Sequence, residues 1–340
     1  MAFSLSSFLS NDIGIDLGTA NTLVWVKGKG IDVNEPSIVA LEKQSRKPLA
    51  IGAKAKEMMG RENPDHIEVI RPLRDGVIAD FDATEEMLRF FIKKVQKNKL
   101  LVRPRIVICV PSGVTPVEMR AVRESAERAG AREVYLIREP MAAAIGIGLP
   151  VEEAVGSMVI DIGGGTTEIA VIALSSIVTS RSIKTAGDDL TDSIVQFLKR
   201  KHNLLVGLRS AEEIKCAIGS ASVQEEELQH TCRGLELVQS IPKTIIVDST
   251  EIAEALRESV SAIIDAVRQT LEQTPPELAA DILDRGIILT GGGALLRGLD
   301  RRLVEETSLP VIVADDPLTC VVRGTGKVLE DISAYQKVLE

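Results

Sequence analysis

Two aspartates in this 340-residue chain each end an apolar run and are each followed by a glycine turn. Asp16 precedes Leu-Gly-Thr-Ala-Asn, and Asp161 precedes Ile-Gly-Gly-Gly-Thr-Thr. Carboxylate oxygens suit Mg²⁺, which keeps several waters and bridges substrate phosphates. The repeated pattern therefore predicts a phosphate site with a Mg²⁺ held by both aspartates through water, since Mg²⁺ keeps several water ligands. The alternative is that both side chains merely cap local turns.

Three glycine-rich turns are candidates for holding the phosphates. Because glycine has no Cβ, neighbouring backbone N–H groups can converge on an anion. The turns contain Gly18, Thr19, Ala20 and Asn21; Gly163, Gly164, Gly165 and Thr166; and Gly291, Gly292, Gly293 and Ala294. The third turn precedes a helical pattern, which predicts that its amides lie at a helix N-terminus. A single turn of this kind is usually only a tight turn, but three together favour a nucleotide site.

The elements that would position these turns occur twice along the chain. Each aspartate ends a buried strand that continues through its glycine turn into a second β-rich run, at Leu23–Val26 and at Ile169–Leu174. Strand and helix patterns then alternate, as in α/β folds with mainly parallel strands. We therefore predict two related α/β domains, each with a mixed sheet opened by a β-hairpin, and a ligand cleft between them.

The remaining predicted elements follow the two hairpins. Strands are expected at Ile106–Val110, Glu133–Ile137 and Gly286–Leu289, and helices at Pro116–Ala129, Met141–Ile145, Asp188–His202, Ala211–Ile218, Glu251–Leu271 and Arg297–Glu306. Pro275 and Pro276 end the long helix because the second proline forces its predecessor out of the helical region. The segment Ser220–Arg233, with three consecutive glutamates, is expected to be a solvated excursion.

Composition limits the possible classes of function. Hydrophobic residues make up 45% of the chain and aromatic residues only 3%, so the apolar material is aliphatic and suits buried parallel strands. The formal net charge of −9 argues against a nucleic-acid partner and requires any membrane contact to be mainly hydrophobic.

The histidines and cysteines lack metal-ligand spacing, which argues against zinc and favours reduced thiols. With no apolar run of ~18 residues and no basic leader, a cytoplasmic protein is expected.

Two short apolar segments are candidate membrane contacts. Residues 1–10 have an amphipathic helical pattern that places Phe8 and Leu9 on its apolar side, and a disordered terminus is the alternative. Leu100 and Leu101 follow four lysines and precede two arginines. A leucine pair is more often part of a core. The surrounding basic residues make a membrane anchor an equally good interpretation here.

The glycine motifs resemble those of a known superfamily. Asp16–Thr22, Asp161–Glu168 and Leu289–Leu295 are similar to the two phosphate loops and the adenosine loop of the ATPases that include actin, DnaK-type chaperones and sugar kinases. Further segments resemble the MreB family of bacterial actin homologues, namely Asn34–Val39, Arg71–Asp80, Glu139–Gly146, Thr274–Leu278 and Val313–Pro317. The resemblance runs from about Asn11 to about Glu330.

This resemblance implies an actin-like ATPase fold with a nucleotide cleft. The amphipathic segment would cover residues 1–10, domain I residues 11–146, domain II residues 147–330 and a tail residues 331–340. Small subdomains would lie at about 34–75 and 187–250.

The resemblance also implies a function and roles for particular residues. The protein would bind ATP or ADP with Mg²⁺, hydrolyse ATP slowly and form membrane-associated filaments that direct cell-wall synthesis and maintain rod shape. Thr19–Asn21 and Gly163–Gly165 would hold phosphates, Gly291–Ala294 the adenosine, and Glu212 with Lys215 the ribose and base. Glu139 and Thr166 would position the attacking water. Implied partners are further copies of the chain, the inner face of the cell membrane, and wall-elongation proteins of the RodZ, MreC and MreD type.

Alternatives to these roles remain open at the level of sequence. Glu212 and Lys215 are three residues apart and could form an ordinary surface ion pair. Glu139 could merely cap the helix that begins at Pro140. A small-molecule phosphotransferase on the same fold is the alternative function, although it needs a further carboxylate base and an acceptor pocket that no motif indicates.

Overall fold

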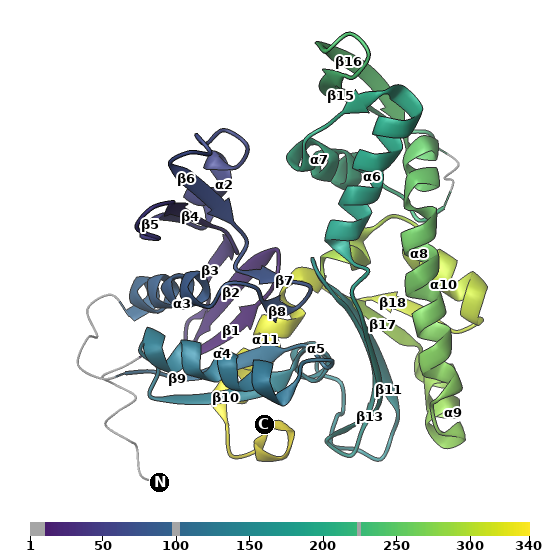
Figure 1. Ribbon diagram of the computed structural model, residues 1–340. Helices are drawn as coiled ribbons and strands as arrows, with labels where there is room; N and C mark the ends of the chain where they lie inside the picture. Colours follow the sequence, from purple (N-terminus) through teal and green to yellow (C-terminus); the bar gives the residue numbers. More distant parts are fainter. Residues whose placement is uncertain (1–10, 97–102, 223–225) are drawn as a thin grey trace.

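The computed structural model describes residues 11–96, 103–222 and 226–340. Two α/β halves stand side by side, the first in purple and blue and the second in teal and green (Figure 1). Each half contains a five-stranded sheet and a smaller sheet beside it. This arrangement confirms the predicted pair of α/β domains.

The first sheet is opened by an antiparallel hairpin of β1 (Ile13–Leu17) and β2 (Asn21–Val26). β2 also pairs antiparallel with β3 (Gly30–Pro36). On the other side, β1 pairs parallel with β9 (Arg105–Val110), and β9 pairs parallel with β10 (Glu133–Arg138). The predicted mixed sheet is therefore confirmed, with the strand order β3-β2-β1-β9-β10.

The second sheet repeats this order with different strands. β11 (Ser157–Ile162) and β12 (Thr167–Ala173) form the hairpin, and β13 (Ser176–Ile183) extends it antiparallel. β11 pairs parallel with β17 (Ile287–Thr290), which pairs parallel with β18 (Val311–Val313). The order β13-β12-β11-β17-β18 matches that of the first sheet strand by strand.

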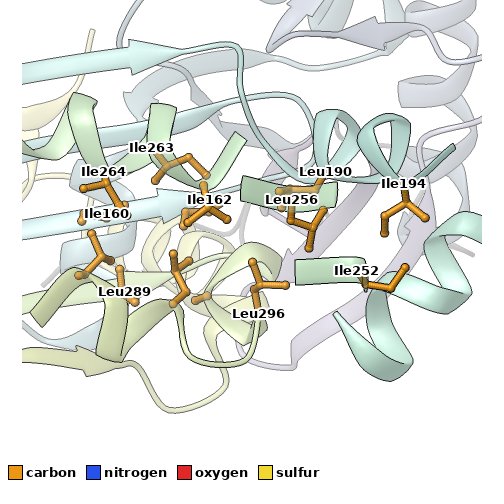
Figure 2. Packing of buried hydrophobic residues seen from close by; sticks show 14 of the residues in the cluster. Ile160, Ile162, Leu190, Ile194, Ile252, Leu256, Ile263, Ile264, Leu289 and Leu296 are labelled. Atoms are coloured by element: carbon orange, nitrogen blue, oxygen red, sulfur yellow. The ribbon is translucent and has the colours of Figure 1, made fainter. Parts of the chain in front are cut away.

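Helices cover the second sheet and bury its apolar face. Side chains of β11, among them Ile160 and Ile162, pack against Leu190 of α6 (Gly187–His202) and Leu256 of α8 (Ser249–Glu272) (Figure 2). Buried residues of α8 recur at helical spacing, which gives this helix one apolar face for the sheet. The aliphatic composition thus serves strands that are covered on both sides.

A small sheet and a helix accompany each half. In the first half β4 (Val39–Glu42) lies between β5 (Pro48–Ile51) and β6 (Ile67–Ile70), next to α2 (Ala53–Met58). In the second half β15 (Gln229–Glu236) lies between β14 (Leu204–Leu205) and β16 (Ile241–Asp248), next to α7 (Leu208–Ile218).

The expectation of a solvated excursion over Ser220–Arg233 is wrong for its last part. Residues from Gln229 onward form β15, and Cys232 is buried against the core of the second half. The polar neighbours Thr231 and Arg233 are exposed on this strand, so their polarity hid the buried position of Cys232.

Two helices between the halves form a shared core. α5 (Glu139–Ile147) and α11 (Cys320–Glu330) pack together with residues of both sheets, including Val107, Val159 and Ala170. Their backbones approach closely, since a Cβ on Gly324 would lie 1.8 Å from the Ala142 carbonyl oxygen and one on Gly146 would lie 1.9 Å from that of Cys320. Glycine is therefore required at both positions of this crossing.

The placement of α11 differs from the sequence-based domain boundaries. This helix packs against β1, β2 and β9 of the first sheet, although residues 320–330 were assigned to domain II. Its apolar face and its glycines fit the space beside α5, so the chain returns to the first half after β18. The chain consequently passes between the two halves twice.

Of the other helices, α4 (Pro116–Ala129) has the expected limits, α10 (Leu299–Thr307) begins later than the expected Arg297, and α3 (Phe81–Gln96) and α9 (Pro276–Arg285) are absent from the expected elements. α4 has the predicted ends, because Thr115 caps it in a capping box with Glu118 and Pro116 occupies its first turn. The remaining strands are the short pair β7 (Leu73–Arg74) and β8 (Val77–Ile78).

Candidate functional site

The glycine turns of the two hairpins lie against each other between the halves. A Cβ on Gly164 would lie 2.8 Å from the Cβ of Ala20, and one on Gly165 would lie 2.7 Å from the Thr19 hydroxyl oxygen. A larger residue at either position would force the turns apart. The geometry therefore brings together two turns that are far apart in the sequence.

The two aspartates that precede these turns are held by neutral donors. The Thr290 hydroxyl donates to Asp161 Oδ1 at 2.9 Å, and the Cys109 thiol donates to Asp16 Oδ1 at 3.3 Å. Burial and the nearby charge of Asp16 raise the pKa of Asp161 to about 7. Burial likewise raises the pKa of Asp16 to about 6, although its hydrogen bond with Cys109 opposes this shift. Two close carboxylates with such pKa values favour the arrival of a cation.

Glu139 joins the same acidic group from α5. Burial, followed by the charges of Glu168, Asp161 and Asp16, raises the pKa of Glu139 well above its ordinary value. The helix-cap alternative is wrong, because Arg138 holds the N-cap position and Glu139 is the first residue of α5. The carboxyl group of Glu139 is thus near enough to feel the charges of Asp16, Asp161 and Glu168.

Thr166 lies at the end of the second glycine turn and is buried. Its carbonyl oxygen accepts a hydrogen bond from the Gly163 amide at 2.9 Å, which closes the turn. A Cβ on Gly76 of the first half would lie 2.8 Å from the Thr166 methyl carbon. Thr166 therefore lies where the second turn meets the first half.

Glu212 and Lys215 on α7 are connected to the second glycine turn through α6. Lys215 Nζ lies 2.7 Å from Glu212 and donates to the Gly187 carbonyl oxygen at 2.7 Å. The amide of Gly187 in turn donates to the Gly163 carbonyl oxygen at 3.1 Å. The side chain of Lys215 is 13% exposed and that of Glu212 is 47% exposed, so the pair is buried at its lysine and open to water at its glutamate.

The third glycine turn lies next to Asp161, but its local structure differs from the one expected. A Cβ on Gly291, whose φ is +78°, would lie 2.5 Å from Asp161 Oδ1. The expectation of a helix N-terminus here is wrong, because Gly292–Leu295 form a single 3-10 turn and α10 begins only at Leu299. Gly298 has φ +70° and separates the two elements. All three turns nevertheless converge around Asp161.

Two contacts between the halves were missed in the sequence. Arg71 pairs with Asp188, and Glu168 of β12 accepts a hydrogen bond from the Ser112 amide of the first half at 2.9 Å. Arg71 and Glu168 both stand inside motifs quoted above, but neither motif names the partner. These pairings depend on the folded arrangement of the halves, so one sequence carried no signal for them.

The remaining expectations concern metal-binding side chains and contacts with a membrane. Across residues 11–96, 103–222 and 226–340, no three or more metal-binding side chains are grouped so that they could hold an ion. Nor does any helix in these ranges have the length and apolarity needed to cross a membrane. The proposed membrane residues Phe8, Leu9, Leu100 and Leu101 lie outside the described residues.

Sequence comparisons find close relatives over nearly the whole chain. A family model described as MreB/Mbl protein matches residues 10–337. The cell shape-determining protein MreB of Escherichia coli strain K12 is 55% identical over 331 residues, which cover 96% of this chain and 95% of the relative. The cell shape-determining protein Mbl of Bacillus subtilis strain 168 is 52% identical over 328 residues, covering 96% and 98%.

Comparisons with solved structures agree. The crystal structure of MreB5 of Spiroplasma citri bound to ADP has a TM-score of 0.91 and 37% identity, and covers 97% of this chain and 98% of its own. A structure of MamK as a double helical filament has a TM-score of 0.79 and 22% identity, covering 94% and 99%. At that identity the second likeness supports the fold alone.

Proposed function

The chain belongs to the MreB/Mbl protein family and has an actin-like fold, and on this premise we propose that it is an ATP-dependent filament protein that maintains cell shape. Structures of the relative MreB5 have been solved with ADP and with AMPPNP. The relatives MreB and Mbl are named as cell shape-determining proteins. We propose the same nucleotide binding and the same cellular role for this chain.

The observation that carries the proposal is the opposition of two glycine turns with an aspartate at the base of each. Gly18 and Thr19–Asn21 would hold phosphates from one side, and Gly163–Gly165 would hold them from the other. Gly291–Ala294 would bind the adenosine, and Glu212 with Lys215 the ribose and base. Small residues and exposed amides at these turns suit an anionic ligand that fills the space between the halves.

Asp16 and Asp161 fit a Mg²⁺ ion that arrives with the nucleotide. Mg²⁺ in nucleotide sites is usually bound by one or two carboxylates, with phosphates and water as its other ligands. Two aspartates are therefore sufficient. The positive charge of the ion would also offset the burial that raises the pKa of both aspartates and the negative charges that further raise the pKa of Asp161.

Hydrolysis is assigned to Glu139 and Thr166. A carboxylate must be ionised to accept a proton from water, and a cation bound beside Glu139 would lower its raised pKa and so favour the ionised form. Its position at the start of α5 places Glu139 beside the aspartates without making it part of any glycine turn. Thr166 would help to orient the same water. Turnover is expected to be slow and to follow polymerisation, so the protein acts mainly as a filament.

Membrane attachment is proposed to depend on Phe8, Leu9, Leu100 and Leu101. Each anchor is small, but a polymer presents many copies to one surface, and avidity then supplies the adhesion. We propose that such filaments bind the inner face of the cell membrane and direct wall synthesis through RodZ-, MreC- and MreD-type partners.

The deciding experiment is sedimentation and electron microscopy of the pure protein with ATP and Mg²⁺, with ADP, and without nucleotide, on lipid vesicles and in their absence. We expect nucleotide-dependent filaments that bind vesicles. A variant with Leu100 and Leu101 changed to Ser and residues 1–9 deleted should bind ATP but lose the vesicles. ATP-dependent phosphorylation of a sugar without any polymer would instead favour the phosphotransferase alternative.

A further inference from the structure

A run of hydrogen bonds connects residues 339 and 340 to the cleft between the halves. Leu339 forms an antiparallel bridge with Ile137, and the Glu340 amide donates to the Leu136 carbonyl oxygen at 2.9 Å. Both partners belong to β10, the outer strand of the first sheet. The two residues thus cover an edge that would otherwise present unpaired backbone groups.

Arg138, at the end of β10, connects Glu340 to the loop of residues 111–112. Its Nε donates to Glu340 Oε1 at 2.9 Å, while its Nη1 donates to the carbonyl oxygens of Pro111 at 3.1 Å and Ser112 at 3.0 Å. A guanidinium group is planar and presents its donors in fixed directions, so one side chain can hold all three acceptors at once. A lysine ammonium at this position would act as a point charge and lose that geometry.

The loop that Arg138 holds reaches the second half. The Ser112 amide donates to Glu168 Oε2 at 2.9 Å, and the Ser182 hydroxyl donates to Glu168 Oε1. The Glu168 side chain is buried, with only 1% of the residue exposed. The contacts therefore run from Glu340 through Arg138 and the loop of residues 111–112 to Glu168.

We propose that Arg138 is a positioning residue: it couples the docking of residues 339–340 to the contact between the halves, and it fixes the start of α5 where Glu139 stands. Glu139 follows Arg138 directly, so a shift of Arg138 displaces the first residue of α5. Release of Glu340 from β10 then loosens the 111–112 loop and slows hydrolysis without a contact to the nucleotide. The effect on hydrolysis rests on the function proposed above for Glu139, whereas the effect on the loop does not.

The test uses the full chain and amide hydrogen exchange resolved at Ser112 and Gly113. We expect exchange in Glu340→Ala to be about fivefold faster than in the unchanged protein, as for loss of one partly exposed charged hydrogen bond. Arg138→Ala should give a larger increase, and Arg138→Lys should not restore protection. Glu340→Gln keeps the acceptor oxygen and should exchange like the unchanged protein.

Glu330→Ala is the matched control. Glu330 also stands near the end of the chain, and it accepts from the Gly28 amide at 3.1 Å and pairs with Lys27, but neither partner leads to the cleft. This variant should leave exchange at Ser112 unchanged. In Glu340→Ala the ATP dissociation constant should stay constant while turnover falls a few-fold, and Glu340→Gln should rescue turnover.

The proposal is overturned if Glu340→Ala and Arg138→Ala leave exchange at Ser112 unchanged, or if Glu330→Ala accelerates it equally. Full turnover in Glu139→Ala has a different meaning. It would contradict the role of Glu139, while the exchange measurements would still decide whether Arg138 couples the two contacts.

Discussion

Arg71 of the first half and Asp188 of the second form an ion pair across the cleft, with 2.6 Å between Nη1 and Oδ2. The Asp188 amide also donates to the Gly164 carbonyl oxygen at 2.7 Å, so the pair is attached directly to the second glycine turn. Since the side chains are 32% and 35% exposed, water screens their attraction. The pair is therefore a weak and reversible contact between the halves.

Loss of this ion pair should weaken nucleotide binding slightly. Because partly exposed ion pairs contribute up to about 1 kcal/mol, Arg71→Ala is expected to raise the ATP dissociation constant about twofold to fivefold. Asp188→Ala should act similarly, and the double variant should be no worse than either single one. Arg46→Ala removes the pairs of Arg46 with Glu68 and Asp80, both within the first half, and is the control in these titrations. Equal losses in all variants would refute a specific role for the pair.

The pH dependence of stability follows from the two aspartates. Their folded pKa values, about 6 for Asp16 and about 7 for Asp161, lie above the ordinary value of 3.8, so the folded protein binds protons more tightly than the unfolded chain. Their contribution to the free energy of unfolding is full below pH 3.8 and is lost as the pH rises through 6 and 7. We therefore expect the melting temperature in EDTA to fall between pH 5 and pH 8 in both proteins, and to fall less in Asp161→Asn than in the unchanged protein. A parallel fall in both proteins would argue against the raised pKa.

Asp161→Ala should abolish Mg²⁺-dependent nucleotide binding and assembly together, because it removes a carboxylate beside both glycine turns. Calorimetric titration with ATP and Mg²⁺, followed by sedimentation, measures both effects. A circular dichroism melt establishes that the variant folds. Unchanged ATP affinity in the folded variant would remove Asp161 from the site.

Glu139→Ala should separate ATP binding from ATP cleavage. We expect unchanged affinity and normal filaments, with phosphate release reduced by ~10²-fold, which is typical for loss of a general base. Glu139→Gln should behave in the same way, because the amide cannot accept the proton. Full turnover in either variant would contradict the catalytic assignment.

The crossing of α5 and α11 should not tolerate a methyl group. A Cβ on Gly324 meets a backbone oxygen that cannot move alone, so Gly324→Ala is expected to lower the free energy of unfolding by about 2 kcal/mol or more. Gly207 has nothing within 4 Å of its Cβ position and a negative φ, which makes Gly207→Ala the matched control. Denaturant unfolding of both variants measures the difference.

Local signals made much of the fold predictable. Asp16 and Asp161 mark the two hairpins because an apolar strand, a glycine turn and a second strand follow one another directly. The ends of α4 were also predictable, since Thr115, Pro116 and Glu118 act on neighbouring backbone groups. Such features depend on a few consecutive residues.

What could not be predicted depends on contacts between distant segments. Helix α11 joins the first sheet because Thr325 fits against Gly14 of β1 and Gly326 fits against the Trp25 ring of β2, and no local pattern shows that fit. The third glycine turn was misjudged for a related reason. Gly298 breaks the path from Gly291 to α10, and its positive φ is a property of the folded backbone.

The two sheets have the same strand order, so each strand of one half has a counterpart in the other. β9 and β17 hold equivalent places, so the loop after β9, at Pro111–Gly113, corresponds to the third glycine turn after β17. A nucleotide has different ends, and two identical halves could not bind both ends differently. The loop after β9 holds Glu168 across the interface, whereas the loop after β17 places Gly291 beside Asp161. The two loops, equivalent in position, therefore give the two ends of the site different chemistry.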